Sequence, residues 1–115
     1  MIRKASEQKT ADLEHCHDGI GTVQATFILD GDAVKDHPVN FMHHTVLPPG
    51  TSVGVHEHTG DDEYYLILSG KGIMTLDEKE YEVTEGDITG VYSGGKHGLR
   101  NTGDTDLHMI VTSVS

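Results

Sequence analysis

Residues 50–70 read GTSVGVHEHTGDDEYYLILSG, which combines metal-binding side chains with the pattern of two short β-strands. His56 and His58 lie two residues apart on the first expected strand, 53–58. Side chains two apart on a strand share a face, so the two imidazoles project together, about 7 Å apart along the strand. Gly54 shares that face and is expected to leave open space beside them. The stretch therefore predicts half of a metal site.

Glu63 and His97 are the candidates for the other half of this site. Glu63 begins the next expected strand, so its carboxylate can reach the imidazoles if the two strands pair or adjoin. His97 ends the sequence SGGKH at 93–97, where glycines allow a tight turn. An exposed pair of histidines is the alternative, but it leaves the nearby glycines, acid and third histidine unexplained. Three imidazoles and a carboxylate suit late first-row transition metals better than calcium or magnesium.

Two motifs in this part of the chain resemble those of the cupin family. The first family motif is G, five residues, H-x-H, three or four residues, E, six residues, G, and it is matched completely from Gly50 to Gly70. The second is G, five residues, P-x-G, two residues, H, three residues, N. It is matched from Gly86 to Asn101, except that Tyr92 replaces the proline, where it could cap the strand or line a pocket mouth.

The resemblance implies a fold, a ligand set and a class of ligand. The fold is a double-stranded β-helix, a jelly-roll barrel of the all-β class. The implied ligands of one divalent metal per chain are His56, His58, Glu63 and His97, with Mn or Fe favoured over Zn, Ni or Co. The chain looks most like small single-domain cupins similar to oxalate decarboxylases. A small anionic, carboxylate-type ligand is therefore expected at the open metal positions.

Turn signals recur about every eight to twelve residues, which is typical of an all-β sandwich or barrel. We expect one cupin domain over 1–115, with an N-terminal arm at 1–21 and the barrel at 22–115. Residues 6–14 could form a short helix or part of the arm. The expected strands are 22–29, 39–47, 53–58, 63–68, 73–76, 81–83, 88–92 and 107–114.

The strand 63–68 is apolar on both faces. Glu63 shares one face with Tyr65 and Ile67. The opposite face carries Tyr64, Leu66 and Leu68. An apolar outer face on a small barrel is usually covered, so we expect a homodimer.

The composition narrows the classes of partner. The chain has 115 residues, with 8 Lys+Arg, 19 Asp+Glu, 9 His and 1 Cys, and its net charge is −11 with neutral histidines. This balance argues against nucleic acid or an anionic membrane, which need a basic patch. One cysteine excludes an intrachain disulfide. The first ten residues, MIRKASEQKT, do not read as a signal peptide, and no membrane-spanning apolar stretch follows, so we expect a cytoplasmic protein.

Three residues are candidates for catalysis near the predicted metal. Tyr65 shares the face of Glu63, where its hydroxyl could orient a substrate or donate a proton, or simply belong to the core. By alternation, one of His43 and His44 faces inward, where it could act as a general base or support a ligand. The pattern does not choose between them. Asp61 and Asp62 are alternative acid ligands.

Other notable residues are assigned structural roles. The His15-Cys16-His17 sequence looks like a metal patch but has no matching partner pair, so we interpret it as a mobile segment over the barrel or a partner subunit. Glu57 is expected to point away from the metal, and His108 to be structural. Asn101 is expected to fix the turn after the second motif by side-chain to backbone hydrogen bonds.

Three functions remain compatible with the sequence. The first is a metal-dependent enzyme on a small anionic substrate, similar to oxalate decarboxylases, with the metal as Lewis acid. No loop glutamate can be placed as its acid–base group. The second is an Fe-dependent dioxygenase. The third is a non-enzymatic metal- or ligand-binding sensor domain. The fold alone does not choose, because it hosts many chemistries.

Overall fold

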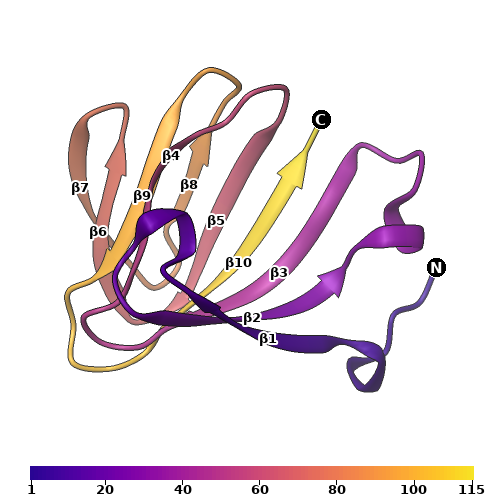
Figure 1. Ribbon diagram of the computed structural model, residues 1–115, viewed down its shortest axis with the longest axis horizontal. Coiled ribbons are helices and arrows are strands. Elements are labelled where there is room, and N and C mark those ends of the chain that lie inside the picture. The colour runs from indigo at the N-terminus through magenta and orange to yellow at the C-terminus, as the bar shows by residue number, and fades with distance from the viewer.

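The computed structural model describes residues 1–115, which form two antiparallel sheets (Figure 1). The six-stranded sheet has the order β1 (Lys9–Glu14), β2 (Thr22–Leu29), β3 (Val39–Leu47), β10 (Leu107–Val114), β5 (Asp62–Ser69), β8 (Ile88–Val91). The four-stranded sheet has the order β4 (Ser52–Glu57), β9 (Lys96–Asn101), β6 (Lys71–Leu76), β7 (Lys79–Thr84). The predicted all-β jelly-roll class is confirmed.

All eight expected strands are present, but two observed strands were not predicted. The strands β2, β3 and β10 have the expected bounds, and the other five differ by one or two residues at their ends. Strand β9 includes His97 and pairs with both β4 and β6, so this histidine lies on a strand rather than in a turn. Strand β1 pairs with β2 along its whole length and follows the short 3-10 turn η1 (Ala5–Glu7).

The core fills the space between the two sheets. Its buried side chains come from the inner faces of both sheets: Val23, Leu47, Tyr65, Ile67, Leu107, Met109 and Val111 from the six-stranded sheet, and Val53, Met74, Val83 and Leu99 from the four-stranded sheet. Along β10, burial alternates strictly with every second residue, as one buried face requires. Each fully buried aliphatic side chain contributes about 1.5–3 kcal/mol before chain entropy is counted.

Asn101 fixes the loop between β9 and β10, as predicted. Its Nδ2 donates to the carbonyls of Leu47 and Thr105, both at 2.8 Å, and its Oδ1 accepts from the Gly103 N–H at 2.8 Å. The residue is only 4% exposed. The bond to Leu47 is buried and the other two are partly buried, so a lost partner is costly, most of all at Leu47.

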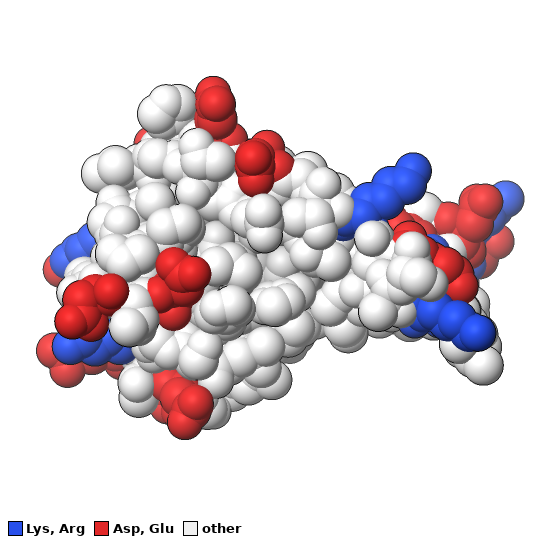
Figure 2. Space-filling model, turned by 90° about the horizontal axis from the view of Figure 1, so that it is seen from below, with Lys and Arg blue, Asp and Glu red and all other residues white.

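The outer face of the six-stranded sheet is apolar around β5 and β8. Leu66 is 38% exposed, Leu68 is 41% exposed, and Ile88 opposite Leu66 is 65% exposed. Charged side chains are unevenly spread over the molecule: the face in Figure 2 has a broad central area without Lys, Arg, Asp or Glu, with charged groups around it.

The helical segments are single 3-10 turns, η1, η2 (Cys16–Asp18) and η3 (Gly31–Val34), and none could span a membrane.

Candidate metal centre and its cavity

The four predicted ligands converge from both sheets. His56 lies on β4 and faces His97 on β9 in register, while Glu63 lies at the start of β5. His58 follows β4, and its backbone N–H and carbonyl bond to Gly95 and Gly94 at 3.0 and 2.7 Å. The glycine turn at 94–95 in the second motif therefore holds the residue His58 of the first motif in place. One ligand atom from each of the four residues lies within 4.8 Å of the others.

The spacing of these atoms fits a single ion. The three histidine Nε2 atoms are 3.0–3.2 Å apart. Glu63 Oε1 lies 3.3 Å from His58 Nε2 and 3.1 Å from His97 Nε2. Neighbouring ligands on an octahedral ion with bonds of about 2.1 Å are about 3 Å apart. Three ring nitrogens and a carboxylate at these distances have the arrangement that a divalent cation would draw together.

Hydrogen bonds orient two of the imidazoles. His56 Nδ1 donates to the Gly54 carbonyl at 2.7 Å, which directs the lone pair of Nε2 toward the cluster. His58 Nδ1 lies 3.1 Å from Asp61 Oδ2, and that oxygen also accepts from Ser113 Oγ at 2.8 Å. Asp61 therefore supports His58 rather than joining the cluster. Such carboxylate–histidine pairs fix the tautomer and the ring orientation of metal-binding imidazoles.

Burial keeps His56 in the protonation state that a metal needs. Glu63 is 5% exposed and His97 is 1% exposed. Burial lowers the pKa of His56 to about 4, although its bond to the Gly54 carbonyl opposes this. Neutral imidazoles are metal ligands and protonated ones are not. The folded chain thus presents His56 in its ligand form without first having to remove a proton at neutral pH.

We expect the metal-free protein to lose stability as the pH falls from about 7 to about 4. Burial lowers the pKa of His43 and His44 as well as that of His56, whereas unfolded histidines titrate near 6.5. In this window the unfolded chain binds more protons than the folded chain, so acid favours unfolding. Urea midpoints in EDTA should fall across the series, less steeply for His56→Gln. A midpoint independent of pH would contradict the expectation.

A cavity of about 150 Å³ lies beside the cluster. It is bordered by Glu63 and by mostly apolar side chains, and its polar walls come from His17, His43 and Thr45. Tyr65 also lines it and is 2% exposed, with its ring centroid 4.7 Å from that of His97. Burial, and then the charge of Glu63, raises the pKa of the Tyr65 hydroxyl well above its usual value, so it stays protonated.

The structure distinguishes the two adjacent histidines of β3. His43 faces the cavity, with its ring stacked on Phe41 at 4.3 Å and edge-on to Phe27 at 4.7 Å. His44 points to the opposite side, where its Nε2 lies 3.0 Å from His108 Nδ1. Of the three catalytic candidates, the fold thus brings His43 and Tyr65 to the cavity and leaves His44 outside.

The segment 15–18 lies over the barrel, as one of the two expected placements has it, and its contact with the cluster was not expected. The imidazoles of His17 and His56 are stacked, with centroids 3.6 Å apart and planes 12° apart. The backbone of this segment fills the space beside Gly54, because a Cβ on Gly54 would lie 2.0 Å from the His17 carbonyl oxygen. The expectation that Gly54 leaves this space open is therefore wrong. Cys16 lines the cavity and packs against the core.

The remaining residues singled out in the sequence lie outside the cluster. Glu57 is exposed at the end of β4, as expected from its position between the two histidines. Asp62 accepts a hydrogen bond from the Ser93 N–H at 3.0 Å. Tyr92 is 62% exposed, and its ring lies 6.3 Å from that of Tyr64.

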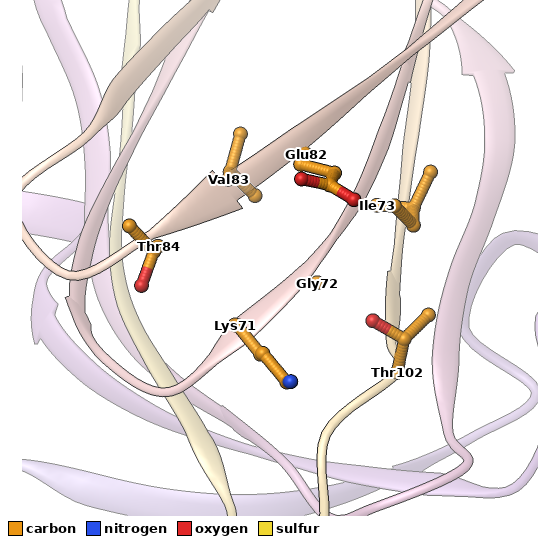
Figure 3. A pocket seen from close by; sticks show the side chains of 7 residues that line it. All are labelled: Lys71, Gly72, Ile73, Glu82, Val83, Thr84 and Thr102. Carbon is orange, nitrogen blue, oxygen red and sulfur yellow. The ribbon is translucent and has the colours of Figure 1, made fainter.

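A separate hollow of about 340 Å³ lies over β6 and β7. Figure 3 shows its lining, in which Lys71 and Glu82 come from these neighbouring strands and Thr102 from the loop after β9. Both charged side chains are exposed. None of the four converging residues lines this hollow, so it is distinct from the cavity beside them.

Comparison with known proteins agrees with the geometry of the site. The sequence signature described as a cupin domain matches residues 43–113, which include all four converging residues. The chain belongs to the cupin family. This cupin is 32% identical over 114 residues to an oxalate-binding protein of Thermotoga maritima, covering 99% of this chain and 93% of the relative. It is also 34% identical over 92 residues to an uncharacterised protein of Methanocaldococcus jannaschii, covering 73% of this chain and 74% of the relative.

Solved structures show the same relationship. A crystal structure of a predicted oxalate decarboxylase from Thermotoga maritima superposes on this cupin with a TM-score of 0.92 at 32% identity, covering 99% of this chain and 98% of the other. The structure of KdgF from a Halomonas species has a TM-score of 0.76 at 15% identity, which is evidence of a shared fold alone. The family and the near full-length match therefore agree with the arrangement of strands described above.

Replacing Asp61 by alanine should weaken metal binding about 10–100-fold, because His58 loses the carboxylate that orients it. The matched control is Asp62→Ala, since the neighbouring carboxylate bonds to the Ser93 backbone instead. Competition with a chromophoric chelator measures both affinities. Equal affinities for the two variants would contradict this role of Asp61.

Proposed function

We propose that this cupin binds one divalent transition metal, Mn or Fe in preference to Zn, Ni or Co, and holds a small carboxylate ligand such as oxalate beside it. The proposed metal ligands are His56, His58, Glu63 and His97. The observation that carries the proposal is the convergence of these four donors within 4.8 Å of one another, with Glu63 also at the wall of a cavity. An oxalate-binding relative that covers almost the whole chain supports the choice of ligand.

The donor spacing also favours a chelating ligand. Each donor pair with a separation of 3.0–3.3 Å has the distance of neighbouring ligands, whereas Glu63 and His56 are farther apart, as opposite ligands are. Such a set leaves two neighbouring positions, which suits two oxygens of one acid. A bound divalent ion supplies Lewis acidity and, with one carboxylate ligand, a local charge of about +1.

The cavity residues supply contacts for the rest of the ligand. His43 makes no hydrogen bond to the protein, and burial lowers its pKa, so its neutral imidazole can donate an N–H to a carboxylate. The Tyr65 hydroxyl stays protonated next to Glu63 and can act as a second donor. A volume of about 150 Å³ restricts the ligand to a few heavy atoms beyond the metal.

Ligand binding is favoured over decarboxylation by the composition of the cavity wall. Glu63 is the only carboxylate that lines it, and that group belongs to the proposed metal set. Decarboxylation of oxalate would need a further proton donor, which leaves His17, His43 or Tyr65 for the task. A Fe-dependent dioxygenase is the alternative enzyme, and a sensor domain is the alternative without catalysis.

The experiment is metal analysis followed by ligand titration. Protein purified without added metal should contain about one transition-metal ion per chain. Calorimetric titration of the metal-loaded protein should show oxalate binding that disappears after chelation. Protein that carries metal but binds neither oxalate nor pyruvate would overturn the ligand proposal. Release of CO₂ from oxalate would identify a decarboxylase, and O₂ uptake with a small acid a dioxygenase.

We also propose that two copies pair through the outer face of the six-stranded sheet. The exposure of Leu66, Leu68 and Ile88 on adjacent strands supports this. Light scattering during size exclusion should give about twice 12.5 kDa, and Leu66→Lys with Ile88→Lys should shift the mass toward 12.5 kDa. A wild-type mass of 12.5 kDa would contradict pairing.

The expected cytoplasmic location stays a prediction that cell fractionation can test.

A further inference from the structure

The ring of His17 covers one face of the His56 ring. The two planes differ by 12° and the centroids are 3.6 Å apart, which is van der Waals contact over the whole ring. The nitrogens of His17 do not belong to the converging set of donors. His17 therefore touches a proposed metal ligand without being one itself.

The backbone around His17 is locked to β4. A Cβ on Gly54 would lie 2.0 Å from the His17 carbonyl oxygen, and a Cβ on Gly19 would lie 2.1 Å from the Ser52 carbonyl oxygen. Two glycines thus allow the chains to approach at the distance of bare backbones. The Ser52 N–H donates to the Ile20 carbonyl at 2.9 Å, and the Ile20 N–H donates to Ser52 Oγ at 2.9 Å.

The same segment contains an unusual concentration of left-handed backbone. The φ angles of His15, His17 and Asp18 are 49°, 51° and 62°. Such a conformation costs energy in residues other than glycine and persists where the surroundings enforce it. The side chains of His15, His17 and Asp18 are all exposed, so burial of these side chains does not account for it. The strain is explained if the segment serves to place the His17 ring.

We propose that His17 is a positioning residue of the metal centre. The stacked ring fixes the plane of His56, while the bond from His56 Nδ1 to the Gly54 carbonyl fixes its tautomer and rotation. A ligand held in its binding orientation loses less freedom when the metal arrives, so the affinity rises. This inference rests on the proposed metal site. It adds residues 15–18 to the two motif regions that hold the ligands, although this segment is far from both in the sequence.

Three variants of the full-length protein test the proposal: His17→Ala, His17→Phe and, as control, His37→Ala in an exposed loop. Competition of Co²⁺ with a chromophoric chelator gives the affinity, and the visible Co²⁺ spectrum reports the ligand geometry. We expect His17→Ala to bind about tenfold more weakly with an altered spectrum. His17→Phe keeps an aromatic ring and should restore most of the affinity, and His37→Ala should match the wild type.

A change at Gly54 provides an independent arm. Gly54→Ala should displace the His17 backbone and weaken binding at least as much as His17→Ala does. Adding His17→Ala to Gly54→Ala should then have little further effect, because the two changes remove the same contact. Thermal melting of the metal-free variants checks that each one folds. Gly54→Ala that fails to fold leaves the His17 variants as the deciding measurement.

Two results would overturn the positioning role while leaving the metal site intact. One is a His17→Ala variant with wild-type affinity and spectrum. The other is a His17→Phe variant as weak as His17→Ala, which would show that the imidazole acts through its nitrogens instead. A wrong assignment of the metal ligands would give a different result, because metal binding would then survive the replacement of His97.

Discussion

Replacing His97 by alanine should reduce bound metal from about one ion per chain to nearly none. His97 Nε2 lies within 3.0–3.2 Å of the other two histidine nitrogens and of Glu63 Oε1. It therefore has three close neighbours among the donors, a property that only His58 shares. Its loss leaves two imidazoles and a carboxylate, and we expect at least a 100-fold lower affinity. Metal analysis and Co²⁺ competition measure the change.

His97 is fully buried, so replacing it can also destabilise the fold. A second variant is therefore needed to distinguish a loss of metal binding from a loss of folding. His56→Ala removes a less buried ligand on the facing strand and should give the same loss. His44→Ala, whose side chain points away from the cavity toward His108, should keep the metal. Wild-type metal content in folded His56→Ala and His97→Ala protein would show that the ion, if any, binds elsewhere.

Replacing Asn101 by alanine should lower the free energy of unfolding by about 3 kcal/mol or more, which is the second large effect. The change leaves two carbonyls and one N–H without their partner, in a place where the side chain is 4% exposed. Each buried polar group left unpaired costs about 1–3 kcal/mol. Urea unfolding measures the loss, and Thr102→Ala in the same loop, at an exposed residue, is the control.

Asn101→Asp refines this test, because aspartate keeps the acceptor for the Gly103 N–H but cannot donate to Leu47 and Thr105. A carboxylate facing two carbonyls should be as harmful as the missing side chain. A stability equal to that of the wild type for both variants would mean that this loop relaxes to recover its hydrogen bonds. The metal affinity of folded protein should change little in either case.

The strands and the four converging residues could be predicted because local patterns encode them. Three of the four buried positions of β10 are apolar, namely Leu107, Met109 and Val111, which is the period-2 pattern of a strand with one buried face. The spacing of His56 and His58 has the same period. Both motifs also place their glycines at fixed distances from the ligands. Information of this kind is contained within a few neighbouring residues.

The features that were missed depend on contacts between distant segments. Strand β9 does not alternate, since His97, Gly98 and Leu99 are all buried, and a glycine without a side chain hides the period. Strand β1 has only Ala11 and Leu13 as apolar residues and is stabilised by its pairing with β2. No periodic pattern indicated it.

The stack of His17 on His56 joins residues far apart in the chain through a left-handed segment that has no sequence signature. One signal could have pointed to it, which is the presence of glycine at 54 on the ligand face and at 19 beside the histidines. Glycine at such a place indicates close approach of another backbone as readily as empty space. The structure shows the first of these at both positions.

The origin of the four donors in both sheets has a consequence for the lifetime of the folded chain. His56 and His97 belong to the four-stranded sheet and Glu63 to the six-stranded sheet, so an ion between them would tie the layers together like a cross-link. Separation of the sheets would then have to wait for the ion to leave. Amide hydrogen exchange should slow in β4, β5 and β9 when metal is present. In a metal-starved cell, this protein would become the easier target for proteases.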